Sequence, residues 1–525
     1  MPSARSVGTL SGPPEPRTPP PLPDASARTH IRGSSLLLFG RLISVVLNFA
    51  VQVLIVRYLT KHDYGAFAYS LGFVAIASSW ALAGMGKTIP RLVPIYLEQH
   101  RYARAFGGLA IAGGTVLGLG VSCVILLHGF QGAVADAVGT DPAYVPLLLI
   151  LIALAPLDAL DNLLQHTAAV FVGPRAIFLR RQVLGPSLRL TAILLVSLVG
   201  GDARLLAYAY VATGFVGVWL YVTVLTREWR KRRLLGYLHP RRLEWPFRDV
   251  FGMSMPLLSS DLSVVLRVSF VVVLLGYFHT APAVAEYRAV LPVAALNMLV
   301  FEAFGFLFVP VASRMFARGD RAGISDLYWQ TCLWIAVVTF PVFAVTTSLA
   351  GPVTVLLFGE RYASAGPILA VLAVGHYVNA ALGFNAATLR VHGRMRIIVA
   401  SEAVVAVGSI ALSVLLVRAY GPLGAAFATT AALVLQNACN HAGLWIAGTG
   451  VSLIDRQFAR LYLVVVAAIA GLWLAQWLLA PSIQVGVALA AVASLAVMWL
   501  TRRAVHLDAM FPELLRLPLV GRLLR

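Results

Sequence analysis

Four polar side chains follow one face of the first long apolar segment of the sequence. Arg41, Ser44, Asn48 and Gln52 are spaced by three, four and four residues, so a helix would place them on the same side. Polar groups inside hydrocarbon are costly, and they face either a partner helix or a water-filled cavity. A stripe that carries a full positive charge favours a cavity that accepts an anion, whereas hydrogen bonding between helices is the alternative.

A second polar stripe occurs at an offset of 219 residues. The tetrapeptide Ser44–Leu47 is repeated as Ser263–Leu266, and this register places Arg267 where the first copy has Asn48. Ser260, Ser263 and Arg267 share a helical face, so two related helices would line one cationic substrate cavity. Asp261 lies beside this stripe and is expected to pair with one of the two arginines or to take part in ion coupling.

A third group of polar residues contains two carboxylates. Asp158, Asp161, Asn162 and Gln165 fall on one face near one end of another apolar segment. Intramembrane carboxylates are typical sites for a coupling proton or Na⁺, and they also anchor nearby arginines. Asp158 and Asp161 are therefore candidates for ion coupling, with anchoring of the adjacent loop as the alternative.

The elements that must position these residues are membrane-spanning helices. The chain has 525 residues, of which 59% are hydrophobic and only 12% are charged; a soluble domain carries about 25% charge. Apolar runs of about 20 residues, the length that crosses hydrocarbon as a helix, alternate with short polar breaks. We predict an all-α integral membrane protein with about fourteen spans: 34–58, 65–85, 105–128, 145–168, 183–200, 205–226, 252–276, 289–313, 327–349, 366–388, 398–417, 423–447, 461–480 and 482–500.

The distribution of Lys and Arg predicts the orientation of these spans. If both ends of the chain are cytoplasmic, inner segments contain 32 of the 41 basic residues and outer loops contain five. Cytoplasmic loops collect Lys and Arg, so this asymmetry predicts that both termini are cytoplasmic. The expected location is the cell inner (cytoplasmic) membrane. The net charge of +19 thus resides in loops beside lipid headgroups, and it does not indicate nucleic-acid binding.

The repeat divides the chain into two parallel six-helix lobes followed by two additional helices. The expected organisation is a Pro-rich disordered tail at 1–33, an N-lobe at 34–226, a basic cytoplasmic linker at 227–251, a C-lobe at 252–447, the additional helices at 448–500, and an amphipathic cytoplasmic tail at 501–525.

Four short segments give the chain a family resemblance: Arg57–Gly65, Gly84–Arg91, Leu357–Tyr362 and Tyr420–Ala426. With these segments in this order on this topology, the chain resembles the polysaccharide flippases of the MOP (MATE-like) exporter superfamily, of the Wzx or oligosaccharide-flippase type. The resemblance implies two six-helix lobes around a central cavity. In members with fourteen helices, it places the extra pair beside the lobes as a groove for a lipid tail.

The function that the resemblance implies is translocation of an oligosaccharide linked to undecaprenyl pyrophosphate from the inner to the outer leaflet. Polysaccharide polymerases and glycosyltransferases are then the expected partners. Two alternatives come from the same superfamily, a lipid II flippase for peptidoglycan and a MATE-type cation-coupled exporter. The basic stripe at Arg41 disfavours export of cationic drugs.

Enzyme function is disfavoured by what the sequence lacks. A membrane polymerase or ligase usually needs a sizeable outer loop for its acid and base groups, and the longest predicted outer loop is 129–144. The three cysteines show no metal-ligand spacing, and we expect neither a metal nor a cofactor beyond a coupling H⁺ or Na⁺. A scaffold that recruits polysaccharide synthases without transport is a further alternative.

Overall fold

The computed structural model describes residues 43–133, 141, 144–172, 179–239, 241, 243–452, 456–479 and 481–505. All regular secondary structure in these residues is helical. A helix satisfies its own backbone hydrogen bonds, which a segment in hydrocarbon must do because no water is present. Eleven helices in the described residues are long and apolar enough to cross a membrane, and three shorter apolar helices accompany them.

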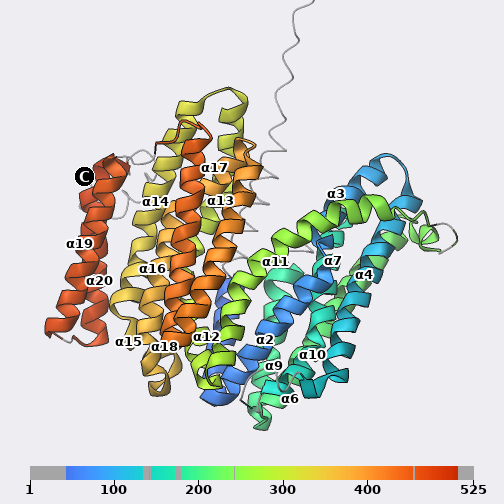
Figure 1. Ribbon diagram of the computed structural model, residues 1–525, viewed down its shortest axis with the longest axis horizontal. Helices are drawn as coiled ribbons and strands as arrows, with labels where there is room; N and C mark the ends of the chain where they lie inside the picture. Colours follow the sequence, from blue (N-terminus) through green and yellow to red (C-terminus); the bar gives the residue numbers. More distant parts are fainter. Residues whose placement is uncertain are drawn as a thin grey trace, which may run out of the picture.

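The N-terminal half forms one bundle, which lies on the right in Figure 1. Its elements are the helix Ile43–Tyr58, α2 (Lys61–Leu82), α3 (Met85–Glu98), α4 (Tyr102–Gly129), α6 (Tyr144–Leu151), α7 (Leu154–Phe171), the π-helical turn η1 (Leu179–Leu184), α9 (Gly185–Val199) and α10 (Ala203–Lys231). The 3₁₀ turn η2 (Leu235–Leu238) follows α10.

The C-terminal half forms the second bundle. It contains α11 (Phe247–Phe278), α12 (Ala281–Ala295), η4 (Leu296–Met298), α13 (Leu299–Ala317), α14 (Arg321–Ser348), α15 (Ala350–Phe358), η5 (Glu360–Ala365), α16 (Gly366–Leu382), α17 (Asn385–Val391) and α18 (Met395–Ile446). The last pair, α19 (Arg456–Leu479) and α20 (Ile483–Val505), packs on α14 at the outer edge of this bundle (Figure 1).

Every predicted span overlaps helix, but several boundaries differ. The predicted span 289–313 begins too late, because the helix starts at Ala281 and continues through η4 to Ala317. Likewise α10 extends to Lys231 and α11 begins at Phe247, so helix occupies both ends of the predicted linker 227–251. The hydropathy of the sequence did not predict these helix ends, because they contain polar residues although they are helical. The number of crossings, fourteen, stays a prediction.

One glycine separates two predicted spans within the longest helix. The 52 residues of α18 form two helical stretches joined at a kink, where Gly421 has φ 56° and ψ −131°. Such backbone angles are accessible to glycine and costly for other residues. Pro422 follows and cannot donate the next backbone hydrogen bond. The chain therefore bends between the spans predicted at 398–417 and 423–447.

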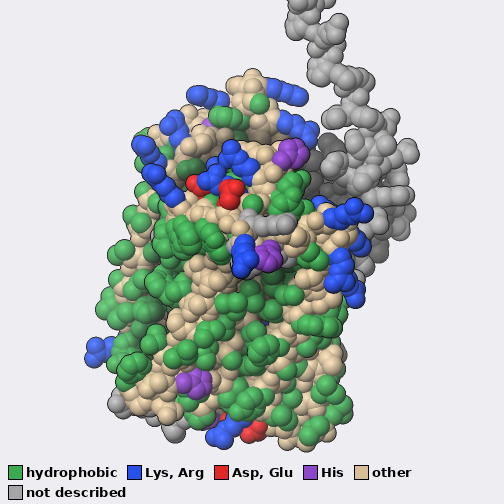
Figure 2. Space-filling model, turned by 90° about the vertical axis from the view of Figure 1, so that its right-hand side faces the viewer, with side chains coloured by type: hydrophobic (Ala, Val, Ile, Leu, Met, Phe, Trp, Pro, Cys, Tyr) green, Lys and Arg blue, Asp and Glu red, His purple; other side chains and the backbone are tan. Residues whose placement is uncertain are grey.

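The two bundles share a hydrophobic core at the lower end of Figure 1, where α2 packs against α12 and α11. The approach is close at Gly65, where an added Cβ would overlap the carbonyl oxygen of Ala281. Lys and Arg side chains gather at the opposite, upper end of the face shown in Figure 2, and hydrophobic side chains cover much of the surface below them. This distribution matches a membrane protein whose basic loops lie at one membrane surface.

Candidate functional site

A cavity of about 1070 Å³ lies between the N-terminal bundle and the α12–α13 region of the C-terminal bundle. Ser44, Asn48 and Gln52 line it with the face that their spacing predicted. Gln52 donates from Nε2 to the Tyr64 hydroxyl and, at 3.4 Å, to the carbonyl oxygen of Arg288, and so bridges α2 and α12. Through Gln52, the first helix thus contacts elements of both halves at the cavity wall.

The other predicted cavity residues cannot be placed against this cavity. Arg41 lies outside the described residues. Ser260, Ser263 and Arg267 belong to α11, but their side chains lie outside the described part of the chain. Their role in substrate binding therefore stays a prediction.

Four arginines line the cavity: Arg180 and Arg181 from η1, Arg189 from α9 and Arg288 from α12. We refer to this space as the arginine cavity. Arg180, Arg181 and Arg288 fall in predicted loops, and the sequence did not predict that they line a cavity. The three carboxylates that share the lining are Asp158, Asp161 and Glu302. The side chains on this wall can therefore hold an anion by charge-assisted hydrogen bonds.

Arg180 is held in place by three neighbours. Its Nη2 donates to Asp161 Oδ1 at 2.5 Å, and its guanidinium carbon lies 4.6 Å from the centroid of the Tyr221 ring. Gly217 on α10 leaves room for this arrangement, because an added Cβ would overlap Arg180 Nη2. Asp161 thus pairs with an arginine of η1, and its role in ion coupling stays a prediction.

The remaining arginines of the cavity are less neutralised. Among the described residues, Arg181, Arg189 and Arg288 make no ion pair within 4.0 Å. The Arg189 guanidinium carbon lies over the Tyr210 ring, 5.9 Å from its centroid. This contact with the ring face stabilises the cation without cancelling its charge. Asp158 faces the same space, and no hydrogen bond of its side chain is found in the described part.

Asp261 belongs to a different contact. It forms an ion pair with Lys87 of α3 and does not line the arginine cavity. The pair with Lys87 was not predicted, and the expected pairing of Asp261 with Arg41 or Arg267, whose side chains lie outside the described residues, stays a prediction. Lys87 follows Gly84, whose φ of 72° lets the chain turn between α2 and α3. The pair joins α3 to α11 beside that turn.

The lower end of the molecule is closed by polar contacts between the two halves. Lys61 of α2 forms an ion pair with Glu286 of α12 at 2.6 Å, and Glu286 also accepts a hydrogen bond from Ser364. Arg57 donates to the carbonyl oxygens of Leu356 and Leu357, and Arg361 donates to those of Val56 and Arg57. We call Arg57, Lys61, Glu286 and Arg361 the interlobe clasp.

The clasp and the cavity account for three of the five exceptions to the charge asymmetry. The five basic residues in predicted outer loops are Lys61, Arg204, Arg288, Arg361 and Arg418. Lys61 and Arg361 close the clasp, and Arg288 lines the cavity. A basic residue in a predicted outer loop, where Lys and Arg are rare, was thus the sequence signal that could have singled out Lys61, Arg288 and Arg361. Two of the segments that carry the family resemblance, Arg57–Gly65 and Leu357–Tyr362, meet here.

Solved structures share this fold. The lipid II flippase MurJ in an inward closed conformation has a TM-score of 0.66 and 14% sequence identity, covering 89% of this chain and 99% of its own. An inward-facing MATE family multidrug transporter of the MOP superfamily has a TM-score of 0.64 and 14% identity, covering 79% of this chain and 99% of its own. The fold is therefore that of MOP superfamily transporters.

The sequence comparisons give the family within this class. The uncharacterized membrane protein MJ1068 of Methanocaldococcus jannaschii is 21% identical over 416 residues, which are 76% of this chain and 80% of that protein. A family model described as polysaccharide biosynthesis protein matches residues 31–316. The chain belongs to this polysaccharide biosynthesis family, whose members are Wzx-type flippases, and it is a multi-pass membrane protein.

Proposed function

We propose that this protein translocates an oligosaccharide linked to polyprenyl (undecaprenyl) pyrophosphate across the cytoplasmic membrane for surface polysaccharide biosynthesis. The observation that carries the proposal is the arginine cavity between the two halves. Four arginines face three carboxylates there, and three of the arginines have no ion-pair partner among the described residues. Such a wall is suited to a ligand that brings negative charge.

The chemistry of a lipid-linked glycan fits this wall. A pyrophosphate and its sugars cannot enter hydrocarbon without a large desolvation cost, whereas the polyprenyl chain prefers hydrocarbon. Arginine binds phosphate through paired N–H donors, and such charge-assisted hydrogen bonds are about twice as strong as neutral ones. Amides and hydroxyls such as Asn48, Gln52 and Thr213 line the same cavity and are suited to sugar hydroxyls.

Alternating access supplies the movement. We propose that the N-lobe (34–226) and the C-lobe (252–447) rock about the cavity. The linker (227–251) and both tails (1–33 and 501–525) would lie on the cytoplasmic side, and the additional helices (448–500) would span the membrane beside the lobes. The interlobe clasp would then close the outer end, and its rupture would open the cavity outward. The concentration of Lys and Arg at the other end supports this orientation.

The carboxylates suggest how the cycle is driven. Asp161 and Asp261 are engaged with Arg180 and Lys87, so Asp158 is the best placed of the three for a coupling H⁺ or Na⁺. A MATE-type exporter of cationic compounds would need an acidic cavity, and the arginines disfavour that function. Polysaccharide polymerases and glycosyltransferases are the proposed functional partners.

A reconstituted assay tests the function. The full-length protein is placed in liposomes with a fluorescent disaccharide linked to undecaprenyl pyrophosphate, and movement between leaflets is followed by quenching from outside. We expect the wild-type protein to accelerate movement over protein-free liposomes. Arg288→Gln should slow it about tenfold or more, because a charge-assisted hydrogen bond contributes about 1.5–3 kcal/mol.

Arg418→Gln is the matched control for this assay. Arg418 is an exposed arginine of α18, in a segment predicted as an outer loop, and it does not line the cavity. Its substitution should leave the rate unchanged. Wild-type protein that does not exceed protein-free liposomes, or an Arg288→Gln variant as fast as Arg418→Gln, would contradict the proposal.

A further inference from the structure

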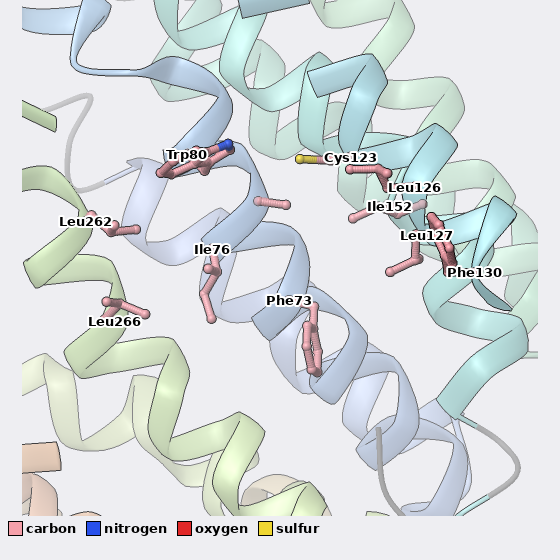
Figure 3. A pocket seen from close by; sticks show the side chains of 11 residues that line it. Phe73, Ile76, Trp80, Cys123, Leu126, Leu127, Phe130, Ile152, Leu262 and Leu266 are labelled. Atoms are coloured by element: carbon pink, nitrogen blue, oxygen red, sulfur yellow. The ribbon is translucent and has the colours of Figure 1, made fainter. Parts of the chain in front are cut away.

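A second recess lies on the N-terminal bundle, and its lining is apolar. It has a volume of about 560 Å³ and is bounded by α2, α4, the chain between α6 and α7, and α11. Figure 3 shows side chains of these elements around one space, among them Phe73 and Trp80 of α2, Leu126 near the end of α4, Phe130 just beyond α4, and Leu262 and Leu266 of α11. We call this recess the apolar groove.

The apolar groove and the arginine cavity lie on opposite sides of a single helix. Within two turns of α2, three residues line the arginine cavity and three line the apolar groove; the first set is Leu71, Val74 and Ala75, and the second is Phe73, Ile76 and Ala77. A helix with its side chains is about 10–12 Å across. The polar site and the apolar site are therefore separated by one helix at the same height.

The other wall of the groove is the helix that joins the two halves. α11 packs against α2, α3 and α4 of the N-terminal bundle and against α18 of the C-terminal bundle. Leu262 of this wall follows Asp261, whose ion pair with Lys87 lies beside the groove. Part of the lining is open to the surroundings, since Trp80 is 47% and Phe130 62% exposed.

We propose that the apolar groove binds the polyprenyl chain of the lipid-linked substrate while its pyrophosphate occupies the arginine cavity. The inference rests on the proposed function and adds a location for the lipid chain. Head and chain are covalently joined, so the two sites must lie within reach of one extended polyprenyl chain that passes around a single helix. The groove meets this condition, and each CH₂ that leaves bulk lipid gains packing contacts with a fixed wall. The proposal places the polyprenyl chain against α2, α4 and α11 rather than against α19 and α20.

Cys123 provides a reporter inside the groove. It lines the groove and is only partly buried, whereas Cys332 is fully buried. In full-length protein with Cys332→Ala and Cys439→Ala, a bilayer-soluble pyrene maleimide should label Cys123. Undecaprenyl pyrophosphate added to the nanodiscs should slow this labelling, whereas geranyl pyrophosphate, whose chain is too short to reach around α2, should not. Labelling that undecaprenyl pyrophosphate leaves unchanged would show that ordinary phospholipid chains fill the groove, and would overturn the proposal.

A filled groove provides an independent readout. Ala77→Trp places a large side chain in the groove, and Ala411→Trp makes the same change at an exposed alanine of α18. We expect Ala77→Trp to weaken binding of undecaprenyl pyrophosphate about tenfold, equivalent to about 1.4 kcal/mol. Geranyl pyrophosphate binding should not change in either variant, and Ala411→Trp should resemble wild type.

The outcomes separate the two proposals. If neither pyrophosphate binds wild-type protein, the proposed function fails and the groove proposal fails with it. If both bind and Ala77→Trp alters neither affinity, the groove proposal fails while the proposed function survives. Selective loss of undecaprenyl pyrophosphate binding in Ala77→Trp supports both.

Discussion

Arg57 and Arg361 exchange hydrogen bonds across the two halves of the molecule. The Arg57 guanidinium donates to carbonyl oxygens next to η5, at 2.6 and 2.8 Å, and Arg361 donates back to the carbonyl oxygen of Arg57 at 2.8 Å. Each arginine therefore satisfies carbonyl groups at the end of a helix in the opposite half. This arrangement stabilises the closed lower end and predicts where the molecule must open.

The ion pair between Lys61 and Glu286 should set how stable that closure is. Both side chains are largely buried, with 24% and 18% exposed, so Glu286→Gln leaves Lys61 partly desolvated without its partner. We expect the closed state to lose about 1–3 kcal/mol. Spin labels on the lower ends of the two halves would report a larger population of long distances. The charge exchange Lys61→Glu with Glu286→Lys should restore the short distances, and failure of Glu286→Gln to change them would count against the clasp.

Gly217 should be essential for the position of Arg180. Gly217→Ala places a methyl group where Arg180 Nη2 now lies, and so separates the guanidinium from Asp161. We expect translocation to fall about tenfold, while thermal stability changes little, because the better helix propensity of alanine, about 1 kcal/mol, offsets part of the cost of losing the ion pair. Gly118→Ala, at a helical glycine with open space around it, is the control and should leave translocation unchanged. Equal rates in the two variants would argue against a role for Arg180.

The sequence predicted the helical fold and one wall of the cavity for local reasons. Hydropathy identifies helices because lipid excludes unsatisfied backbone groups, and helical spacing places Ser44, Asn48 and Gln52 on one face. The sequence did not predict that Arg180 and Arg288 line the cavity. Their positions depend on the π-helical turn η1 and on the packing of α12 against α2, which helical spacing alone does not reveal. The pair between Asp261 and Lys87 was not predicted for the same reason, since the two residues are 174 positions apart.

Asp158 and Asp261 should differ in their effect on coupling. Asp158 faces the arginine cavity, whereas Asp261 is occupied by Lys87. We expect Asp158→Asn to abolish the acceleration of translocation by an imposed proton or Na⁺ gradient, because a neutral amide takes up no proton and lacks the charge that attracts Na⁺. Asp261→Asn should retain the acceleration. The liposome assay with and without each gradient provides the measurement, and a gradient response that survives Asp158→Asn would exclude this carboxylate as the coupling site.

The prediction of a cationic cavity from the sequence depends on Arg41 in the first predicted span and Arg267 in the seventh. Replacing either with alanine should abolish export of the surface glycan while the amount of protein in the membrane stays normal. Glycan on intact cells is measured by antibody or lectin binding, and the protein by immunoblotting. If both variants export normal amounts of glycan, the two arginines do not contribute to substrate binding.

The central claim is that a pyrophosphate headgroup occupies the cavity between the two halves. Cryo-electron microscopy of the protein in nanodiscs with a disaccharide linked to undecaprenyl pyrophosphate tests it most directly. The account predicts phosphate density within hydrogen-bonding distance of Arg288 and of Arg180 or Arg189. Phosphate density found only on the lipid-facing surface, with the cavity holding no ligand at saturating substrate, would contradict it.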